Sequence, residues 1–243
     1  MNLLRDLERC CSVPLEVILT LNVPETLPFD PGVFSFPVKV VHNAVLKGFG
    51  ANHNAAFREA RGEYFCVLNP DIRITEDPYP GLFEHLSGED IGVVAPAVVN
   101  PAGALEDSAR RFPTVWTLIR KACAGGTQID YPVADAGMEP DWVAGMFLLF
   151  RSSVFRRMKG FDEGYFLYYE DVDLCMRLRA AGYRVLRVPD VPVVHDARRE
   201  SRRNLRYLSW HVRSVVRYLL ITRYRGRAYL ASQRASARSP VPR

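Results

Sequence analysis

Cysteine is scarce in this 243-residue sequence, and its pattern excludes two common uses of the residue. The chain has no C-x-x-C pair, so a zinc site built on that spacing is not expected. The odd number of cysteines argues against the disulfide framework of a small secreted domain. We therefore expect a protein of a reducing compartment. The five cysteines are Cys10, Cys11, Cys66, Cys123 and Cys175.

Long apolar runs are also missing. No wholly apolar run is longer than that of residues 146–150, whereas a membrane-spanning helix needs about 20 residues. The first residues do not show the charged and then apolar pattern of a signal peptide. A cytoplasmic location is the simplest expectation.

The composition itself is that of an ordinary globular protein. Apolar residues make up 48% of the chain and charged residues 24%, which excludes a disordered or fibrous protein. A chain of 243 residues can bury a full core, as one large α/β domain or two small ones.

The charge is distributed unevenly along the chain. Residues 198–243 contain 13 arginines, no lysine and one acid, Glu200, so this extension carries +12 while the whole chain carries +5. An acidic body with a basic extension points to an anionic partner, either a membrane surface or a nucleic acid. A solvated helical face with a disordered end is the alternative. We predict a body of residues 1–197 and a helical, arginine-rich extension of residues 198–243.

Short apolar runs alternate with helical patterns along the body. Runs of this length that are rich in β-branched residues are typical of buried strands. Their alternation with helices predicts an α/β fold, a mostly parallel sheet flanked by helices. We predict strands at residues 15–21, 38–42, 64–68, 91–99, 143–150 and 183–188, helices at 3–11, 51–61 and about 168–181, and a loop or lid at about 100–141.

Polar side chains follow three of these strands. Sheets of this kind bind ligands at the carboxyl ends of their strands, so Asn22, Asn43 and Asp71 are expected at one crevice. In Asn69-Pro70-Asp71 the proline ends the ladder and presents Asp71 at the sheet edge. A carboxylate there could hold Mg²⁺ on a diphosphate, although these residues are also common in plain turns.

A glycine-rich segment, residues 47–54 (KGFGANHN), leads into a predicted helix. Gly48, Asn52 and Asn54 are candidates for phosphate or nucleotide contact at this helix N-terminus. The segment lacks both the dinucleotide fingerprint and the P-loop pattern. Capping of the helix by the two asparagines is the alternative.

Three acids within four residues, Glu170, Asp171 and Asp173, form the most suggestive cluster. Such carboxylates repel one another unless a helix N-terminus, a cation or a catalytic task holds them. Asp173 lies four residues before Arg177 and is expected to pair with it. Asp171 has no basic partner at that spacing, which leaves it available as a general base. A purely structural segment is the alternative.

Two further positions stand near these elements. Asp162 and Glu163 precede the acidic helix and are candidates for orienting its loop. His195 follows the last predicted strand and could ligate a metal or bind a phosphate, although a lone histidine is more often structural.

Three stretches together resemble family 2 glycosyltransferases of the GT-A fold, in particular their bacterial rhamnosyltransferase-like branch. They are FGANHNAAFREARGEYFCVLNPDIRI, WVAGMFLLFRSSVFRRMKGFDEGYFLYYEDVDLCMRLRAAGYRV and VPVVHDARRES. The similarity covers about residues 10–220. Each motif alone is weak, but Asn-Pro-Asp, Phe-Asp-Glu and Glu-Asp-x-Asp at these separations are specific.

The resemblance implies roles for the motif residues. Asp71 would bind Mg²⁺ or Mn²⁺ on the diphosphate of a nucleotide sugar, and His195 would complete the metal or diphosphate site. Asn69 would help to place the donor. Asp171 would be the catalytic base, supported by Glu170. The donor-sugar and acceptor side would be shaped by Trp142, Gly145, Met146, Asp162 and Glu163, and Asn22 stands near the position that contacts the nucleotide base.

The implied activity is a single inverting displacement on a nucleotide-diphosphate sugar. A rhamnosyl donor is the family-level expectation, and the acceptor would be a hydroxyl of a bacterial surface glycan or of a lipid-linked glycan. The extension would then rest on the inner membrane surface as a peripheral helix, and no nucleic-acid partner is expected.

Other interpretations remain open at this point. In the family, a first strand and most of a helix precede the segment that matches residues 3–21, and we expect them upstream because a missing central strand would expose two sheet edges. A degenerate member that binds nucleotide without catalysis is therefore one alternative. A nucleotidyltransferase is another, but the glycine- and basic-rich triphosphate loop it needs is not found. A membrane- or nucleic-acid-binding module is opposed by the acidic body.

Overall fold

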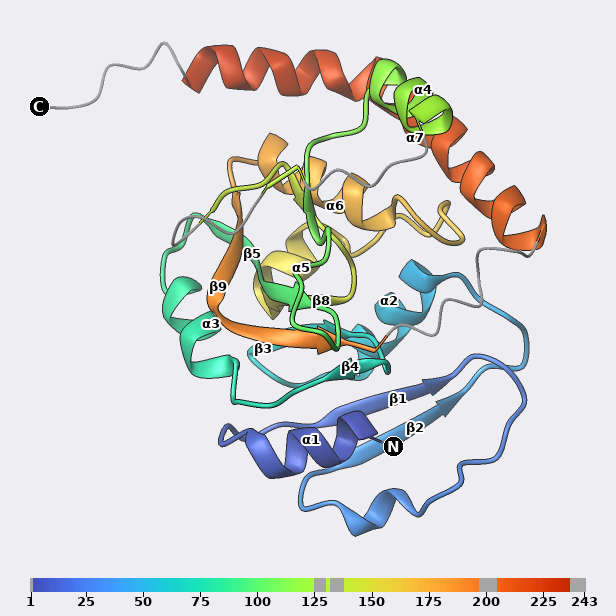
Figure 1. Cartoon of the computed structure of the whole chain (residues 1–243), viewed down its shortest axis with the longest axis vertical. Coiled ribbons are helices and arrows are strands. Elements are labelled where there is room, and N and C mark those ends of the chain that lie inside the picture. Colours follow the sequence, from blue (N-terminus) through green and yellow to red (C-terminus); the bar gives the residue numbers. More distant parts are fainter. Residues whose placement is uncertain (1, 125–129, 132–137, 197–204, 237–243) are drawn as a thin grey trace, which may run out of the picture.

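The computed structural model describes residues 2–124, 130–131, 138–196 and 205–236, in which strands and helices alternate (Figure 1). The elements in chain order are α1 (Asn2–Cys10), β1 (Val17–Leu21), the 3-10 turn η1 (Pro31–Val33), β2 (Val38–His42), α2 (Phe49–Glu59), β3 (Tyr64–Leu68), β4 (Ile72–Arg73), α3 (Tyr79–His85), β5 (Ile91–Val99), β6 (Ala109–Arg110), α4 (Val115–Ala124), β7 (Trp142–Val143), β8 (Phe147–Arg151), α5 (Ser152–Arg157), α6 (Glu170–Ala180), β9 (Arg184–His195) and α7 (Leu205–Ser236).

The central sheet has five strands in the order β3-β8-β5-β9-β4. Only β5 and β9 pair in parallel, whereas β3 with β8, β8 with β5 and β9 with β4 are antiparallel. The predicted α/β class with flanking helices is confirmed, but the sheet is mixed rather than mostly parallel. The reason is that β8 and β4 enter it antiparallel to their neighbours.

Two small sheets complete the strand pairing of the described residues. β1 and β2 run parallel and pair only with each other, and β6 pairs antiparallel with β7. Among the described residues, the first pair therefore makes no ladder with the central sheet.

β5 is the central strand because its sequence is apolar on both faces. Eight of its nine residues are buried, as the unbroken run IGVVAPAVV requires. The ladder with β9 shifts its register between Pro96 and Val98, since proline has no N–H to donate.

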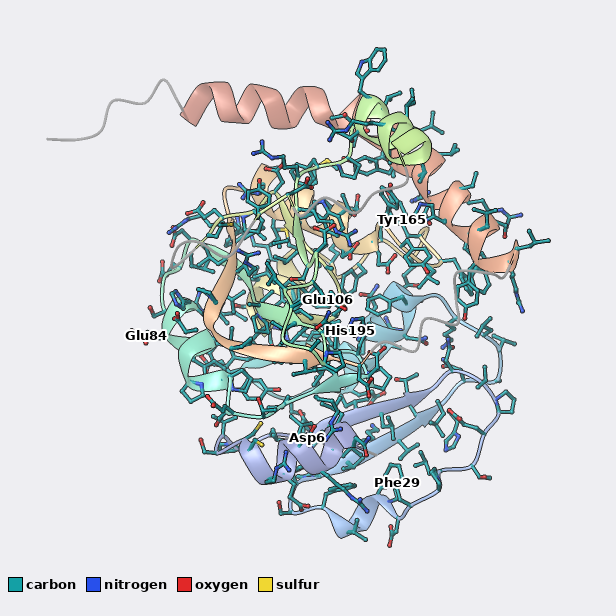
Figure 2. The ribbon with its side chains drawn as sticks, viewed as in Figure 1. Asp6, Phe29, Glu84, Glu106, Tyr165 and His195 are labelled. Carbon is teal, nitrogen blue, oxygen red and sulfur yellow. The ribbon has the colours of Figure 1, made fainter. Side chains whose placement is uncertain are left out.

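The core lies on both faces of this sheet. One cluster joins β8 to α5, α6 and α7 through residues such as Phe155, Leu174 and Tyr218. The other joins the opposite face to α1 and α3 through Leu7 and Leu82. The buried carboxylate of Asp6 fixes α1 below β4, because it accepts hydrogen bonds from Arg73 Nε (2.6 Å) and the Ile74 N–H (3.2 Å) (Figure 2).

Three predicted elements differ from the structure. The strand expected at residues 143–150 is divided into β7 and β8, because the chain between them leaves the sheet. The region of residues 100–141 is not simply a loop, since it contains β6 and α4. The last strand continues beyond residue 188 to His195, which thus lies at the end of β9.

The predicted helical extension is α7, and it packs on the body rather than standing free. Tyr218 is 3% exposed, and the Ser214 hydroxyl donates to the Leu167 carbonyl (2.9 Å). Among the described residues, no helix is long and apolar enough to cross a membrane. The end predicted to be disordered lies outside the described residues.

Candidate active site

Three asparagines meet at the carboxyl ends of β1 and β2. Asn43 donates from its amide to Asn22 Oδ1 (2.9 Å) and to Asn52 Oδ1 (2.7 Å). Asn22 also exchanges two hydrogen bonds with the backbone of Lys47, from Nδ2 to the carbonyl (2.9 Å) and from the Lys47 N–H to Oδ1 (3.0 Å). The structure therefore brings together Asn22 and Asn43, two of the three residues expected at one crevice, and adds Asn52 from α2, whereas Asp71 contacts His195 instead.

An open hollow of about 670 Å³ lies beside this amide cluster. Asn43 belongs to both, so the hollow begins where the cluster ends. It therefore lies at the carboxyl ends of β1 and β2. Its lining consists of Val23, Pro24, Glu25, Thr26, His42, Asn43 and Ala44.

Gly48 is required by a close backbone approach at the start of α2. A Cβ at this position would lie 2.5 Å from the carbonyl oxygen of Phe166, and the Phe49 N–H donates to that same oxygen (2.8 Å). Gly48 thus lets α2 lie against the loop that leads to α6.

A second cluster forms where β4 pairs with β9. Register places Ile72 opposite His195, so Asp71 lies beside the imidazole. Asp71 Oδ2 is 3.3 Å from His195 Nε2, and Glu106 Oε2 is 2.7 Å from His195 Nδ1. Figure 2 shows Glu106 and His195 next to each other at the centre of the molecule.

The electrostatics of this cluster follow from its two carboxylates. The hydrogen bond with Asp71, supported by Glu106, raises the pKa of His195 to about 9, so the ring is protonated at neutral pH. The same bond to His195 lowers the pKa of Asp71. The second carboxylate oxygen of Asp71, Oδ1, is buried and has no hydrogen-bond partner.

The donor set of this cluster suits a divalent cation only when substrate completes it. Within the described residues, no three His, Cys, Asp or Glu side chains are gathered as they would be around a metal ion. Mg²⁺ nevertheless commonly binds one or two carboxylates and takes its other oxygens from water and phosphate. The unpartnered Oδ1 of Asp71 is such an oxygen.

Asp171, the predicted base, lies in the first turn of α6, and two backbone donors hold its carboxylate. The Gly145 N–H donates to Oδ2 (2.9 Å) and the Val172 N–H donates to Oδ1 (2.8 Å). Burial raises the pKa of Asp171, and these two N–H groups oppose the rise. The result is a fixed carboxylate that is more basic than one in water.

Glu170 is more deeply buried than its neighbour. Its side chain is 4% exposed and its Oε2 has no hydrogen-bond partner. Burial, followed by the charge of Asp171, raises the pKa of Glu170 to about 8. Asp173, by contrast, makes the predicted ion pair with Arg177 (2.7 Å).

The segment between β7 and β8 connects the two carboxylate positions. Met146 accepts a hydrogen bond from the Asn69 N–H (3.0 Å), and Gly145 donates to Asp171. The Ala144 N–H donates to the Ser108 carbonyl (2.8 Å), two residues after Glu106. Asp171 and the Asp71–His195–Glu106 cluster are thus attached to the same short stretch of backbone.

Asn54 has a different place from the other asparagines. It is 8% exposed, its Nδ2 donates to the Phe161 carbonyl (2.9 Å) and to Glu163 Oε1 (3.0 Å), and its Oδ1 accepts from the Phe161 N–H (2.9 Å). Because both polar groups of the amide are used, we reassign Asn54 from donor contact to holding the loop that contains Asp162 and Glu163.

Two of the acceptor-side candidates are structural anchors as well. Asp162 pairs with Arg217 of α7 (2.7 Å), and although burial opposes it, this pairing lowers the pKa of Asp162. Trp142 is 6% exposed and donates from Nε1 to the Arg111 carbonyl (3.0 Å), with Arg110 over its ring at 5.1 Å. Neither side chain is free to move independently of the body.

The backbone before α6 is strained. Tyr168 and Tyr169 have φ values of 69° and 71°, a region that residues other than glycine rarely occupy. Such strain is often kept at functional sites, and here it directly precedes Glu170 and Asp171.

Glu106 is the site residue that the sequence did not reveal. It lies in the stretch predicted as a loop or lid, without a motif around it. A signal was nevertheless present, since a histidine at the end of a strand needs a partner for its second nitrogen. Which of the 27 acids provides it depends on the fold.

The fold and the candidate site have the arrangement expected of a nucleotide-sugar glycosyltransferase, and comparison with known proteins shows this class. The model of the family described as glycosyl transferase family 2 matches residues 29–147. Rhamnosyltransferase WbbL of Escherichia coli is 34% identical over 184 residues, which are 71% of this chain and 70% of that protein. The chain belongs to family 2 of the glycosyltransferases.

A second relative carries a more detailed name. The N-acetylglucosaminyl-diphospho-decaprenol L-rhamnosyltransferase of Mycobacterium tuberculosis is 31% identical over 168 residues, 65% of this chain and 55% of that protein. The two relatives place the chain in the rhamnosyltransferase-like part of the family.

Solved structures show the same fold. GalNAc-T7, determined with UDP, GalNAc and Mn²⁺, has a TM-score of 0.57 and 16% identity, covering 76% of this chain and 38% of that one. Residues 1–349 of S. aureus TarS, determined with UDP-GlcNAc, have a TM-score of 0.55 and 15% identity, covering 81% and 54%. The GT-A fold is thereby confirmed.

Proposed function

We propose that this chain transfers a rhamnosyl group, with inversion, from a nucleotide-diphosphate sugar to a hydroxyl of a glycan or lipid-linked acceptor in the cytoplasm. The observation that carries the proposal is the fixed carboxylate of Asp171, which the N–H groups of Gly145 and Val172 hold. Gly145 lies in the segment between β7 and β8 that also reaches the Asp71 cluster. The names of the two relatives support rhamnose as the sugar. Residues 1–197 carry the transfer and residues 198–243 form its extension.

The donor binds across the ends of β1, β2 and β3 in this proposal. The hollow next to Asn43 takes the nucleotide base, and the amide cluster contacts the ribose. The diphosphate then lies toward Asp71 and the protonated His195, whose positive charge favours an anionic leaving group.

Asp71 is the residue that would hold a divalent cation, with His195 beside it. The bound cation would neutralise charge on the departing diphosphate. The support is the buried, unpartnered Oδ1 of Asp71 together with the substrate oxygens that a diphosphate offers.

Asp171 acts as the general base. It takes the proton of the acceptor hydroxyl as the oxygen attacks the anomeric carbon and the carbon–oxygen bond to the diphosphate breaks on the opposite face. The raised pKa of Asp171 makes it a stronger base, and base catalysis of this kind contributes typically about 10² to 10⁴-fold. The Gly145 and Val172 N–H groups keep the carboxylate aimed during the step.

The experiment combines transfer with nucleotide binding. The chain is incubated with nucleoside-diphosphate rhamnose and an N-acetylglucosaminyl-diphospho-lipid, with Mn²⁺ or with chelator, and the product is measured by mass. We expect Asp171→Asn to lower the rate about 10² to 10⁴-fold while nucleotide-dependent thermal stabilisation is kept. Asp71→Ala should reduce both, and the exposed Glu76→Gln should change neither.

The outcomes separate the competing functions. Nucleotide binding without any product, in the wild-type chain and across a panel of donors, would indicate a degenerate member of the family. A product retaining the donor configuration would contradict the inverting mechanism. An unchanged transfer rate in Asp171→Asn would show that Asp171 is not the general base.

A further inference from the structure

Exposed apolar side chains gather on two helices far along the chain. Among the described residues, eight of the 13 large apolar side chains that are exposed belong to α4 and α7. The two helices lie at the same end of the molecule, and the Tyr218 hydroxyl donates to the Pro113 carbonyl (3.2 Å) just before α4 (Figure 1). We call these eight the apolar face: Val115, Trp116, Ile119, Leu205, Leu208, Val212, Val216 and Leu220.

On α7 these residues form one continuous stripe. Leu208, Val212, Val216 and Leu220 follow one another at intervals of four, which places them along one side of a helix. Each is more than half exposed. The buried Ser214 and Tyr218 lie between them in sequence and face the body, so the stripe lies on a side of α7 that is turned away from the body. Packing against the part of the chain that the structure describes does not cover this stripe.

The charge beside the stripe is of a single sign. Between residues 205 and 222 the cations are Arg206, Arg213 and Arg217, and there is no acid. Arg206 and Arg213 are exposed, and Arg217 is paired with Asp162 of the body. The extension as a whole carries 13 arginines against one acid. Whatever covers the apolar face must therefore be apolar and anionic.

We propose that the apolar face of α4 and α7 docks on an anionic lipid bilayer, with the helices lying in the interface. An apolar stripe flanked by arginine is the pattern of a helix resting on a membrane surface. α7 cannot span the bilayer, since none of the described helices is long and apolar enough. A second copy is disfavoured because it would bring two arginine-rich extensions together.

Docking there would place the acceptor side of the site at the membrane. α7 contacts the loop before α6 at several points, among them Trp210 on Phe166 (ring centroids 4.4 Å apart) and Arg217 on Asp162. This loop leads directly to Asp171. The benefit for a lipid-linked acceptor rests on the proposed function, whereas the docking itself does not depend on it.

The test measures binding to vesicles and needs no activity. The full chain is sedimented with vesicles of phosphatidylcholine alone and with vesicles containing an equal share of phosphatidylglycerol. We expect binding to the anionic vesicles that weakens as salt is added. In Val212→Glu/Val216→Glu, which alters only exposed positions, affinity should fall about tenfold or more, because apolar contact is lost and charge is added.

A matched variant controls for the added charge. Val33 and Val45 are 66% and 70% exposed and lie in the N-terminal third of the chain, so Val33→Glu/Val45→Glu changes the net charge equally. It should bind vesicles like the wild type. Equal losses in both double variants, or a wild-type chain that stays in the supernatant with anionic vesicles, would overturn the proposal.

Two readouts identify the helices and the occupant. Trp116 of α4 is 80% exposed, so tryptophan quenching by brominated lipid should decrease in Trp116→Phe. Unchanged quenching would show that α4 does not take part in the contact with the bilayer. Light scattering that shows a dimer lost in Val212→Glu/Val216→Glu would assign the face to a second copy and overturn membrane docking.

Discussion

At the scale of single residues, Glu170 has an environment that makes the stability of the fold depend on pH. Burial and the neighbouring Asp171 raise its pKa to about 8 from an ordinary value of 4.5. Between these values the folded chain holds a proton that the unfolded chain has lost. The contribution of Glu170 to the free energy of unfolding is therefore fully present below about pH 4.5 and is lost as the pH rises through about 8.

The variant Glu170→Gln tests this assignment, because the amide cannot ionise. We expect the denaturant midpoint of the wild type to fall between about pH 5 and 8.5, and the midpoint of the variant to fall less. The exposed Glu76→Gln should keep the wild-type slope. A variant with the same pH dependence as the wild type would show that Glu170 is already ionised in the fold.

Glu106 is expected to act on cation binding through His195. Its carboxylate, 2.7 Å from Nδ1, fixes the ring so that Nε2 faces Asp71. Loss of a carboxylate that orients a metal-ligating histidine typically weakens metal binding about 10- to 100-fold, and His195 would join the cation once it has released its Nε2 proton. We expect Glu106→Ala to raise, by about this factor, the Mn²⁺ concentration needed for the thermal shift with nucleoside diphosphate.

The conservative variant Glu106→Gln distinguishes a role in positioning the His195 ring from a general destabilisation of the fold. Gln at position 106 can still accept a hydrogen bond from the imidazole, so Glu106→Gln should lie between the wild type and Glu106→Ala. If both variants need the same Mn²⁺ concentration as the wild type, Glu106 has no role toward the cation.

At the scale of elements, the N-terminus of α2 illustrates why some glycines cannot be replaced. A Cβ on Gly48 would meet the Phe166 carbonyl at 2.5 Å, a backbone atom that cannot turn aside. We expect Gly48→Ala to destabilise the fold by about 1–3 kcal/mol in denaturant unfolding. Gly81 in α3 has no atom within 4 Å of its Cβ position, so Gly81→Ala should be neutral or stabilising by up to about 1 kcal/mol. Equal effects would contradict the close approach at Gly48.

The elements also show what the sequence can predict. The strands at residues 38–42, 64–68 and 91–99 are confirmed with their bounds, because each is a short run rich in apolar residues that is followed directly by Asn. The run at residues 143–150 looks equally strand-like, yet it breaks at Ala144. The cause is contact with Ser108, Asn69 and Asp171, which are distant in sequence.

The candidate site follows the same division. Asn22 and Asn43 follow β1 and β2, Asp71 lies in the turn after β3, and His195 ends β9, and the rule for α/β sheets places ligands at such strand ends. Asn52 reaches Asn43 from α2. Glu106 and the buried role of Asn54 depend on which loops fold back over the sheet. Periodicity and local motifs contain no information about that choice.

At the scale of the whole molecule, α7 joins the extension to the loop before α6. The junction is one ion pair, Arg217 with Asp162 (2.7 Å), with the Ser214 hydroxyl bond and ring contacts of Tyr169 with Tyr218 (5.2 Å) around it. Motion of α7 relative to the body is therefore expected to reach Tyr169 and the start of α6.

Asp162→Asn should loosen this junction without unfolding the body. The pair is partly exposed, with Arg217 at 40%, so its loss should cost about 1 kcal/mol. Hydrogen exchange measured by mass spectrometry should then become faster in residues 205–222 and in the loop of residues 162–169, and stay unchanged in β5, which is buried at the centre of the sheet. Glu59→Gln, which breaks the exposed pair with Lys39, should leave α7 unchanged. Faster exchange in β5 as well would mean that Asp162 supports the whole fold, and unchanged exchange in α7 would mean that its apolar contacts alone hold it to the site.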